Sequence, residues 1–372
     1  MIHPAIRDLF QELARQPEFQ KLLHRLHGDE AGQVSASLSL SGLTTTAKAI
    51  YLVLLWQATE RPQVVIVDGS KQAEILAELV KTFFQILVPD SATPQPQMIP
   101  ALDVLPSQNL SPHPEVSEQR VIGLWRLARG GAPITITPVA SALLKAQPAD
   151  FYRQLALTLE AGEELPLELL VEHLESAGYE RREPVEMVGE YSVRGGIVDI
   201  FPAESQRPVR IEFFGDTIES LRRFDTATQR SVAPTTRCTV LPLLEWPRDR
   251  ALLAELAEKA CLDHPPPPGE TFPGWEFRVP LLYPRTGFLT RLAERAALVV
   301  DEPEQVQGAA ERLWKRLDDA PPTAADLAQR NFWRWEDLAT DLSRTATLEL
   351  RQIDLDSGAG RSSFHIPSQP SM

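Results

Sequence analysis

A segment near the amino terminus has residues whose types and spacing approach those of a phosphate-binding loop. Gly42–Ala49 follows a short apolar run, precedes a long apolar helix pattern, and matches part of the pattern G-x-x-x-x-G-K-[ST]. Gly42 and Lys48 fit this pattern. Ala47 stands where a second glycine would let the backbone wrap a phosphate, and Ala49 lacks the hydroxyl that would hold magnesium. The sequence therefore predicts a degenerate nucleotide loop without ATP hydrolysis.

A second pair of residues able to do chemistry lies far along the chain. Asp301 and Glu302 directly follow the apolar run Ala297–Val300, and a strand that ends in two acids can hold a magnesium ion. The same acids also suit an ordinary helix start before Pro303, because negative charge is favourable at a helix N-terminus. Since the phosphate loop is degenerate, we favour the structural interpretation.

One alternative function stays open on these residues. Lys48 together with Asp301 and Glu302 could form a weak nucleotide- or DNA-binding site of a helicase-like fragment with residual ATP binding. The threonines Thr44–Thr46 could also bind an anion at the start of the following helix.

Arginines are concentrated in the middle of the chain. Between Arg181 and Arg237 there are nine arginines, no lysine and nine acids, in a chain with a net charge of -14. A planar guanidinium can form two parallel hydrogen bonds with a carboxylate, whereas an ammonium cannot. A surface that follows nucleic acid mixes lysine with arginine and carries net positive charge. The pattern therefore predicts a protein-docking face, and a solvated sheet face with alternating salt bridges is the alternative.

Other classes of site have no support in the sequence. Two cysteines, Cys238 and Cys261, are too few for a disulfide framework or a cysteine zinc site. No nucleophile–base–acid constellation, metal-ligand cluster or dinucleotide motif occurs, so we expect no catalytic residue, no metal and no cofactor in this stretch. Without a signal peptide or an apolar run long enough to span a membrane, we expect a cytoplasmic monomer.

The arrangement of apolar runs indicates how these residues are positioned. Alternating strand and helix patterns predict an α/β fold: a helicase-like parallel-sheet domain with a degenerate P-loop, interrupted by a smaller inserted α+β domain. Its two parts are expected at 1–139 and 229–352, and the insertion at 140–228. Residues 353–372, rich in Gly, Ser and Pro, are expected to form a disordered tail.

Two sequence blocks carry a family resemblance. Arg194–Pro202 and Ile211–Asp225 closely resemble a block shared by the excision-repair protein UvrB and the transcription-repair coupling factors. Leu105–Pro114 is similar to the coupling factors. UvrB has a tyrosine-rich hairpin near this point, but no tyrosine lies between Tyr51 and Tyr152 here. The chain therefore resembles the N-terminal, UvrB-like module of a coupling factor.

This resemblance implies a role in nucleotide excision repair. The module would recruit UvrA to RNA polymerase stalled at DNA damage and would contact DNA weakly or not at all. The ATP-dependent DNA translocase of the family, with its ATP and magnesium, and the polymerase contact would lie in downstream domains.

The resemblance also implies which residues bind UvrA. Arg194 matches the docking arginine of the family, and Arg181 and Arg182 lie near a second one. Ile197 and Phe201 could supply an apolar centre. For Phe201, a place in the domain core is the alternative.

Overall fold

The structure is a computed structural model. It describes residues 8, 10, 12–28, 38–88, 93–260, 262, 264–345, 347–353 and 362–366. The chain divides into two compact units, of which the first comprises 1–107, 126–149 and 285–372 and the second 108–125 and 150–284. Within the described ranges, no helix is both long and apolar enough to cross a bilayer.

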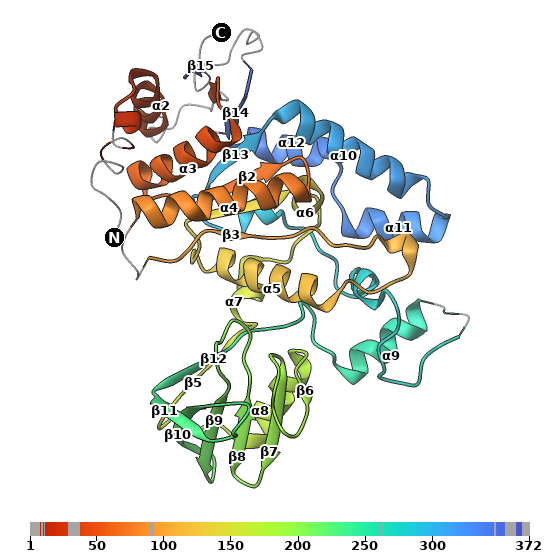
Figure 1. Cartoon of the computed structure of the whole chain (residues 1–372). Coiled ribbons are helices and arrows are strands. Elements are labelled where there is room, and N and C mark those ends of the chain that lie inside the picture. Colours follow the sequence, from red (N-terminus) through yellow and green to blue (C-terminus); the bar gives the residue numbers. More distant parts are fainter. Residues whose placement is uncertain are drawn as a thin grey trace. The chain divides into compact units, whose positions relative to one another are not determined.

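A parallel sheet forms the centre of the first unit (Figure 1). Its seven described strands follow the order β15-β1-β14-β13-β2-β4-β3, and all neighbouring pairs are parallel. The strands are β1 Leu38–Ser41, β2 Gln63–Val67, β3 Gln97–Met98, β4 Ile134–Pro138, β13 Ala297–Asp301, β14 Thr347–Leu350 and β15 Ser362–His365.

Helices cover both faces of this sheet, which explains why its central strands are continuous apolar runs rather than alternating ones. All five residues of β2 are buried. On one face, Val65, Val67 and Val299 pack with α3 and α4. Helix α6 contacts β2, and helix α10 contacts β13. The helices of this unit are α2 Pro17–Gly28, α3 Thr45–Thr59, α4 Ser70–Leu87, α6 Val139–Ala142, α10 Pro303–Asp318, α11 Pro322–Asn331 and α12 Trp335–Ser343.

Helix α3 is apolar on nearly every side because it lies inside the unit. Its residues from Ala47 to Leu55 are all buried, and it contacts both α2 and α4. The side chain of Thr44 caps its N-terminus by accepting a hydrogen bond from the amide of Ala47. The helix therefore begins within the Gly42–Ala49 pattern, so Ala47, Lys48 and Ala49 lie in its first turns.

The second unit is built on a mixed six-stranded sheet. Its order is β11-β10-β9-β8-β7-β6; β6 and β7 are parallel and the other pairs antiparallel. A further two-stranded antiparallel sheet joins β5 and β12. The elements are α5 Pro114–Ala128, α7 Ala149–Arg153, β5 Leu157–Glu160, α8 Leu167–Ser176, β6 Glu180–Arg181, β7 Glu190–Arg194, β8 Ile197–Ile200, β9 Val209–Phe214, β10 Thr217–Phe224, β11 Ser231–Thr235, β12 Arg237–Val240 and α9 Arg250–Lys259; the last three residues of α5 are counted with the first unit.

The core of this unit lies on one face of the six-stranded sheet. Alternate strand residues such as Val198, Ile211 and Leu221 pack with Leu170 and Leu174 of α8. The strands alternate, as expected for an antiparallel sheet with one solvated face. Gly215-Asp216 joins β9 and β10 in a tight hairpin, with Gly215 at φ +62.

The division of the chain differs from the boundaries expected from sequence. The second unit continues to 284 instead of ending at 228, because β12 pairs with β5 rather than returning to the parallel sheet. Beyond it, α9 belongs to a separate small core around Trp246 and Trp275.

The stretch 353–372, expected to be a disordered tail, includes Ser362–His365 among the described residues. These residues form β15, which pairs with β1 over four positions, while Phe364 and Ile366 pack on the core. Backbone hydrogen bonding along an open sheet edge holds a segment with few apolar residues. Residues 354–361 and 367–372 lie outside the described residues.

Candidate functional site

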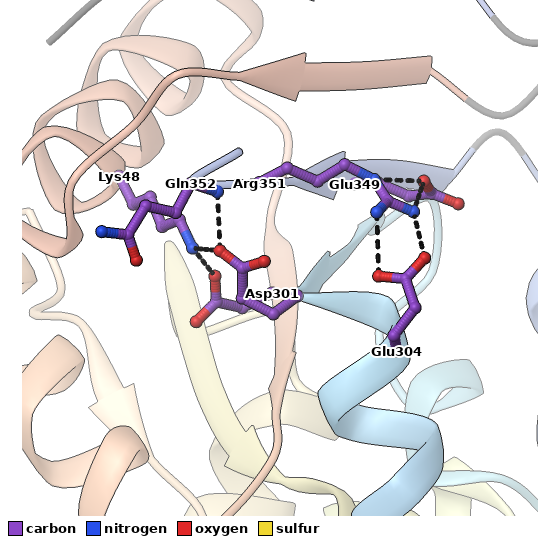
Figure 2. A network of polar contacts seen from close by, with 7 residues as sticks. Lys48, Asp301, Glu304, Glu349, Arg351 and Gln352 are labelled. Atoms are coloured by element: carbon purple, nitrogen blue, oxygen red, sulfur yellow. Dashed lines mark hydrogen bonds and ion pairs between the residues drawn. The ribbon is translucent and has the colours of Figure 1, made fainter. Parts of the chain in front are cut away.

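The degenerate phosphate loop sits at the carboxyl end of β1, where parallel sheets carry their ligand sites. The structure brings Lys48 together with Asp301, the last residue of β13, and with Glu302, which follows that strand (Figure 2). The Lys48 side-chain nitrogen lies 2.5 Å from an oxygen of each acid, and the lysine is only 2% exposed. Its positive charge is therefore neutralised by two carboxylates of its own chain.

Both acids have further partners. Asp301 Oδ2 accepts a hydrogen bond of 3.1 Å from the Gln72 amide, and Glu302 Oε1 accepts one of 2.7 Å from the backbone N–H of Gln352. Burial raises the pKa of Asp301 above its usual range, while the Lys48 ammonium acts in the opposite direction. The cluster thus depends on Lys48 to keep a buried carboxylate charged.

A second ionic cluster lies beside the first at the same end of the sheet (Figure 2). Arg351 is buried, and its guanidinium donates two hydrogen bonds, of 2.8 and 2.9 Å, to Glu304 in the first turn of α10. It also donates to Glu349 at 2.9 Å. These contacts connect the end of β14 to the start of α10.

The space over the loop is filled by the chain itself. A Cβ atom added to Gly42, which has φ +83, would lie 2.5 Å from the backbone oxygen of Ile366. The Ser41 hydroxyl lies 3.1 Å from His365 Nδ1, and the Ile366 amide donates to the Ser41 carbonyl at 3.0 Å. Ala47 and Ala49 are both buried in α3. The segment that follows β15 thus occupies the position next to the loop glycine.

The arginines expected from sequence lie on the six-stranded sheet of the second unit. Strand alternation places one set of side chains on the core face and the other on the opposite face, which we call the arginine face. The arginine face consists of Ser192, Arg194, Ile197, Asp199, Arg210, Glu212, Phe214, Ser220 and Arg222.

Asp199 organises the centre of this face. It is 1% exposed and lies on β8 opposite Arg210 of β9. Arg210 donates from Nε to Oδ1 at 2.7 Å and from Nη2 to Oδ2 at 2.8 Å, and Arg194 donates from Nη2 to Oδ2 at 2.7 Å. Hydrogen bonding to Asp199 raises the pKa of Arg210 above its usual range. One buried carboxylate therefore orients two guanidiniums.

Arg194 remains available to a partner. Its side chain is 45% exposed, and its ion pair with Glu183 spans 3.9 Å. Its cross-strand neighbour is Ile197, which is half-buried. These two predicted residues lie side by side on the arginine face.

The other predicted residues lie elsewhere on the same sheet. Arg181 and Arg182 are exposed at the edge strand β6 and just after it, and Arg182 pairs with Glu180 at 3.2 Å. Phe201 follows β8 and is half-buried; its backbone pairs with Gly189 and Glu190. Phe201 is thus at the opposite end of β8 from Ile197.

Sequence reasoning did not include Asp199 or Arg210 among the site residues. Both stand inside the quoted sequence blocks, but their pairing depends on the register of β8 against β9, which the sequence does not state. A lone Asp within an apolar strand was the signal, because a buried carboxylate requires a partner. Among the described residues, no group of His, Cys, Asp and Glu could hold a metal ion.

One comparison with known protein families falls on this second unit. A family described as the UvrB interaction domain matches residues 157–246, which include the arginine face but not the degenerate loop. A transcription-repair-coupling factor of Bacillus subtilis is 29% identical over 228 residues, covering 61% of this chain and 18% of that protein. One of Escherichia coli is 30% identical over 214 residues, covering 58% of this chain and 18% of that protein.

A transcription-repair-coupling factor of Mycobacterium tuberculosis is 33% identical over 223 residues, covering 58% of this chain and 17% of that protein. The aligned part is less than a fifth of the length of these relatives. The family resemblance is confirmed: the chain carries a UvrB interaction domain and is similar to transcription-repair coupling factors.

Proposed function

We propose that this chain is a UvrA-docking module, similar to the N-terminal UvrB-like part of a transcription-repair coupling factor, and that it recruits UvrA of nucleotide excision repair. The UvrB interaction domain at 157–246 supports this assignment. The observation that carries it is the arginine face of that domain, where Arg194 is oriented by a buried carboxylate and yet half-exposed.

The chemistry of Arg194 suits a carboxylate on a partner protein. Asp199 holds one edge of its guanidinium, which fixes the side chain and lowers the entropy lost on binding. The exposed donors can then form hydrogen bonds with a second carboxylate. Arg181 and Arg182 lie at the β6 edge of the same sheet, and Ile197 contributes apolar contact beside Arg194.

The degenerate loop has a structural role in this proposal, and the stretch is not an enzyme. Lys48 is neutralised by Asp301 and Glu302, and the backbone of Ile366 occupies the place next to Gly42. Both observations disfavour the alternative of residual nucleotide binding. They also fit a degenerate P-loop within a helicase-like sheet.

The wider role follows from the relatives. A coupling factor acts at RNA polymerase stalled at DNA damage, and we assign polymerase displacement and ATP-driven translocation to domains other than these two units. DNA contact by this stretch is weak or absent because the chain has a net charge of -14. We place the protein in the cytoplasm, acting as a monomer until it binds UvrA.

Binding of purified UvrA to the chain tests the proposal, with the dissociation constant measured by biolayer interferometry. We expect micromolar or tighter binding that falls about tenfold or more in Arg194→Ala. Arg330→Ala is the matched control, because Arg330 is also partly exposed and paired with an acid but lies in the first unit. No binding would refute the function, and equal loss in both variants would refute the site.

A further inference from the structure

The most exposed large apolar side chain among the described residues is Phe214, which is 80% exposed. It is the last residue of β9, directly before the Gly215-Asp216 turn. Single exposed apolar residues are common and carry no argument alone. Three observations distinguish Phe214. They concern the backbone contacts of its hairpin tip, its place on the arginine face, and the glycine turn beside it.

The hairpin tip that carries Phe214 is held by backbone hydrogen bonds from outside the hairpin. The Leu165 amide donates to the Asp216 carbonyl at 2.7 Å, and the Ile218 amide donates to the Glu163 carbonyl at 2.9 Å. Glu164 forms an isolated bridge with Thr217. The backbone of the tip is therefore held in place, so little backbone entropy is lost when the tip binds a partner.

Phe214 belongs to the arginine face. Its neighbour Phe213 packs into the core, so alternation directs Phe214 to the face that carries Glu212. Glu212 is the cross-strand partner of Ile197 and lies 3.7 Å from Arg222, whose side chain is 49% exposed. The phenyl ring thus shares a face with two half-exposed guanidiniums, those of Arg194 and Arg222.

The adjacent turn leaves the ring uncovered. Gly195-Gly196 connects β7 and β8, and the Phe213 amide donates a hydrogen bond of 2.8 Å to the Gly196 carbonyl. An added Cβ on Gly196 would lie 2.9 Å from the Phe213 carbonyl oxygen, whereas one on Gly195 would meet nothing within 4 Å. Two residues without side chains therefore adjoin the hairpin beside Phe214.

We propose that Phe214 is the aromatic anchor of the docking face, which inserts into an apolar pocket of UvrA whose rim carries carboxylates. This inference rests on the proposed function and adds an exposed apolar centre to it, whereas Phe201 is half-buried and lies at the other end of β8. Aromatic residues fixed near arginines are the usual centres of binding energy in protein interfaces. Arg194 and Arg222 pair with the rim, and the complementary charge fixes the orientation of docking.

The test compares UvrA binding by four forms of the full chain: wild type, Phe214→Ala, Phe214→Tyr and Leu169→Ala. Leu169 is the matched control, because it is an exposed apolar residue of the same unit on α8, which covers the other face of the sheet. We expect Phe214→Ala to bind at least about tenfold more weakly, mainly through faster dissociation, and the other two variants to stay within about twofold.

The possible failures are distinguishable. If wild type binds UvrA and Arg194→Ala weakens it, but Phe214→Ala does not, the anchor is wrong and the proposed function stands. If the wild-type chain does not bind UvrA, the proposed function itself is refuted, and the anchor proposal falls with it. Sedimentation velocity of the chain alone gives a third outcome: a dimer that Phe214→Ala converts to a monomer would show that Phe214 binds a second copy instead. Near-identical circular dichroism of the variants confirms that folding is unchanged.

Discussion

Replacing Lys48 by methionine isolates the charge that holds the degenerate loop together. Methionine keeps the unbranched shape of lysine in a packed site but has no positive charge. Lys48 lies 2.5 Å from both Asp301 and Glu302, so the substitution leaves two acids without their common cation. The alkyl part of the site is preserved, and the measured effect is mainly electrostatic.

The expected loss of stability follows from the burial of the two acids. Removing one partner of a buried ion pair costs about 3–5 kcal/mol, because the other charge stays buried and unpaired. Asp301 is almost fully buried, but Glu302 is partly exposed, so water screens the unpaired charge of Glu302. We therefore expect a loss of about 3 kcal/mol in the free energy of unfolding of the first unit at neutral pH.

The loss should depend on pH in a defined direction. Burial already raises the pKa of Asp301, and removal of the opposing Lys48 ammonium raises it further. A carboxyl whose folded-state pKa lies above its unfolded value stabilises the fold less as pH rises through that interval. Lys48→Met should thus be less destabilised at pH 5 than at pH 8, and a second substitution, Asp301→Asn, should restore part of the stability.

Urea unfolding with tryptophan fluorescence, combined with hydrogen exchange of α3 peptides, measures the effect in the first unit. Lys21→Met is the matched control, because Lys21 pairs with Glu18 on the exposed surface of α2; we expect less than about 1 kcal/mol there. A loss below about 1 kcal/mol for Lys48→Met, or a loss that grows toward pH 5, would refute the electrostatic account.

Three other predictions concern single residues. Asp199→Asn should weaken UvrA binding about tenfold by releasing the two guanidiniums from their shared carboxylate, and equal binding by interferometry would contradict this. Gly42→Ala should speed hydrogen exchange in β1 and β15, since the new Cβ meets the Ile366 oxygen at φ +83; unchanged exchange would contradict the close approach. In a Cys261→Ser background, Cys238 should resist Ellman's reagent at pH 8.5 until the chain unfolds, because burial raises the pKa of its thiol to about 12. Stability should also fall as pH rises above about 8.5, where the unfolded thiol loses its proton first; rapid native labelling would contradict the burial.

Local patterns were sufficient for the elements around the degenerate loop. A continuous apolar run predicts a strand buried on both faces, and β2 is one. Gly215-Asp216 is a turn of the kind that favours a hairpin, and it joins β9 to β10, since two-residue turns of this kind have few alternatives. From the sequence, contact of Lys48 with Asp301 and Glu302 was expected only as part of a nucleotide-binding site. The sequence could not show that the two carboxylates neutralise the charge of Lys48.

Long-range pairing was not predictable in the same way. The separation of β12 from β5 by more than seventy residues leaves no local signal that they form a sheet, and the second unit continues past the boundary expected at 228. Likewise, β15 is held by the edge of β1 rather than by its own composition. Phe214 was visible in the sequence as an apolar strand residue, but the alternation of β9 alone does not say that its face is uncovered.

The two cationic sites of the chain show why one is suited to binding a partner and the other is not. Lys48 is buried and its ammonium group is paired with two carboxylates, so the positive charge that a phosphate would bind is already neutralised. Arg194 shares a single carboxylate with Arg210 and keeps nearly half of its side chain in water. A cation attracts a partner only through donors that the fold leaves accessible. The arrangement of internal acids, rather than the number of basic residues, is therefore the reason that we propose the arginine face as the docking surface.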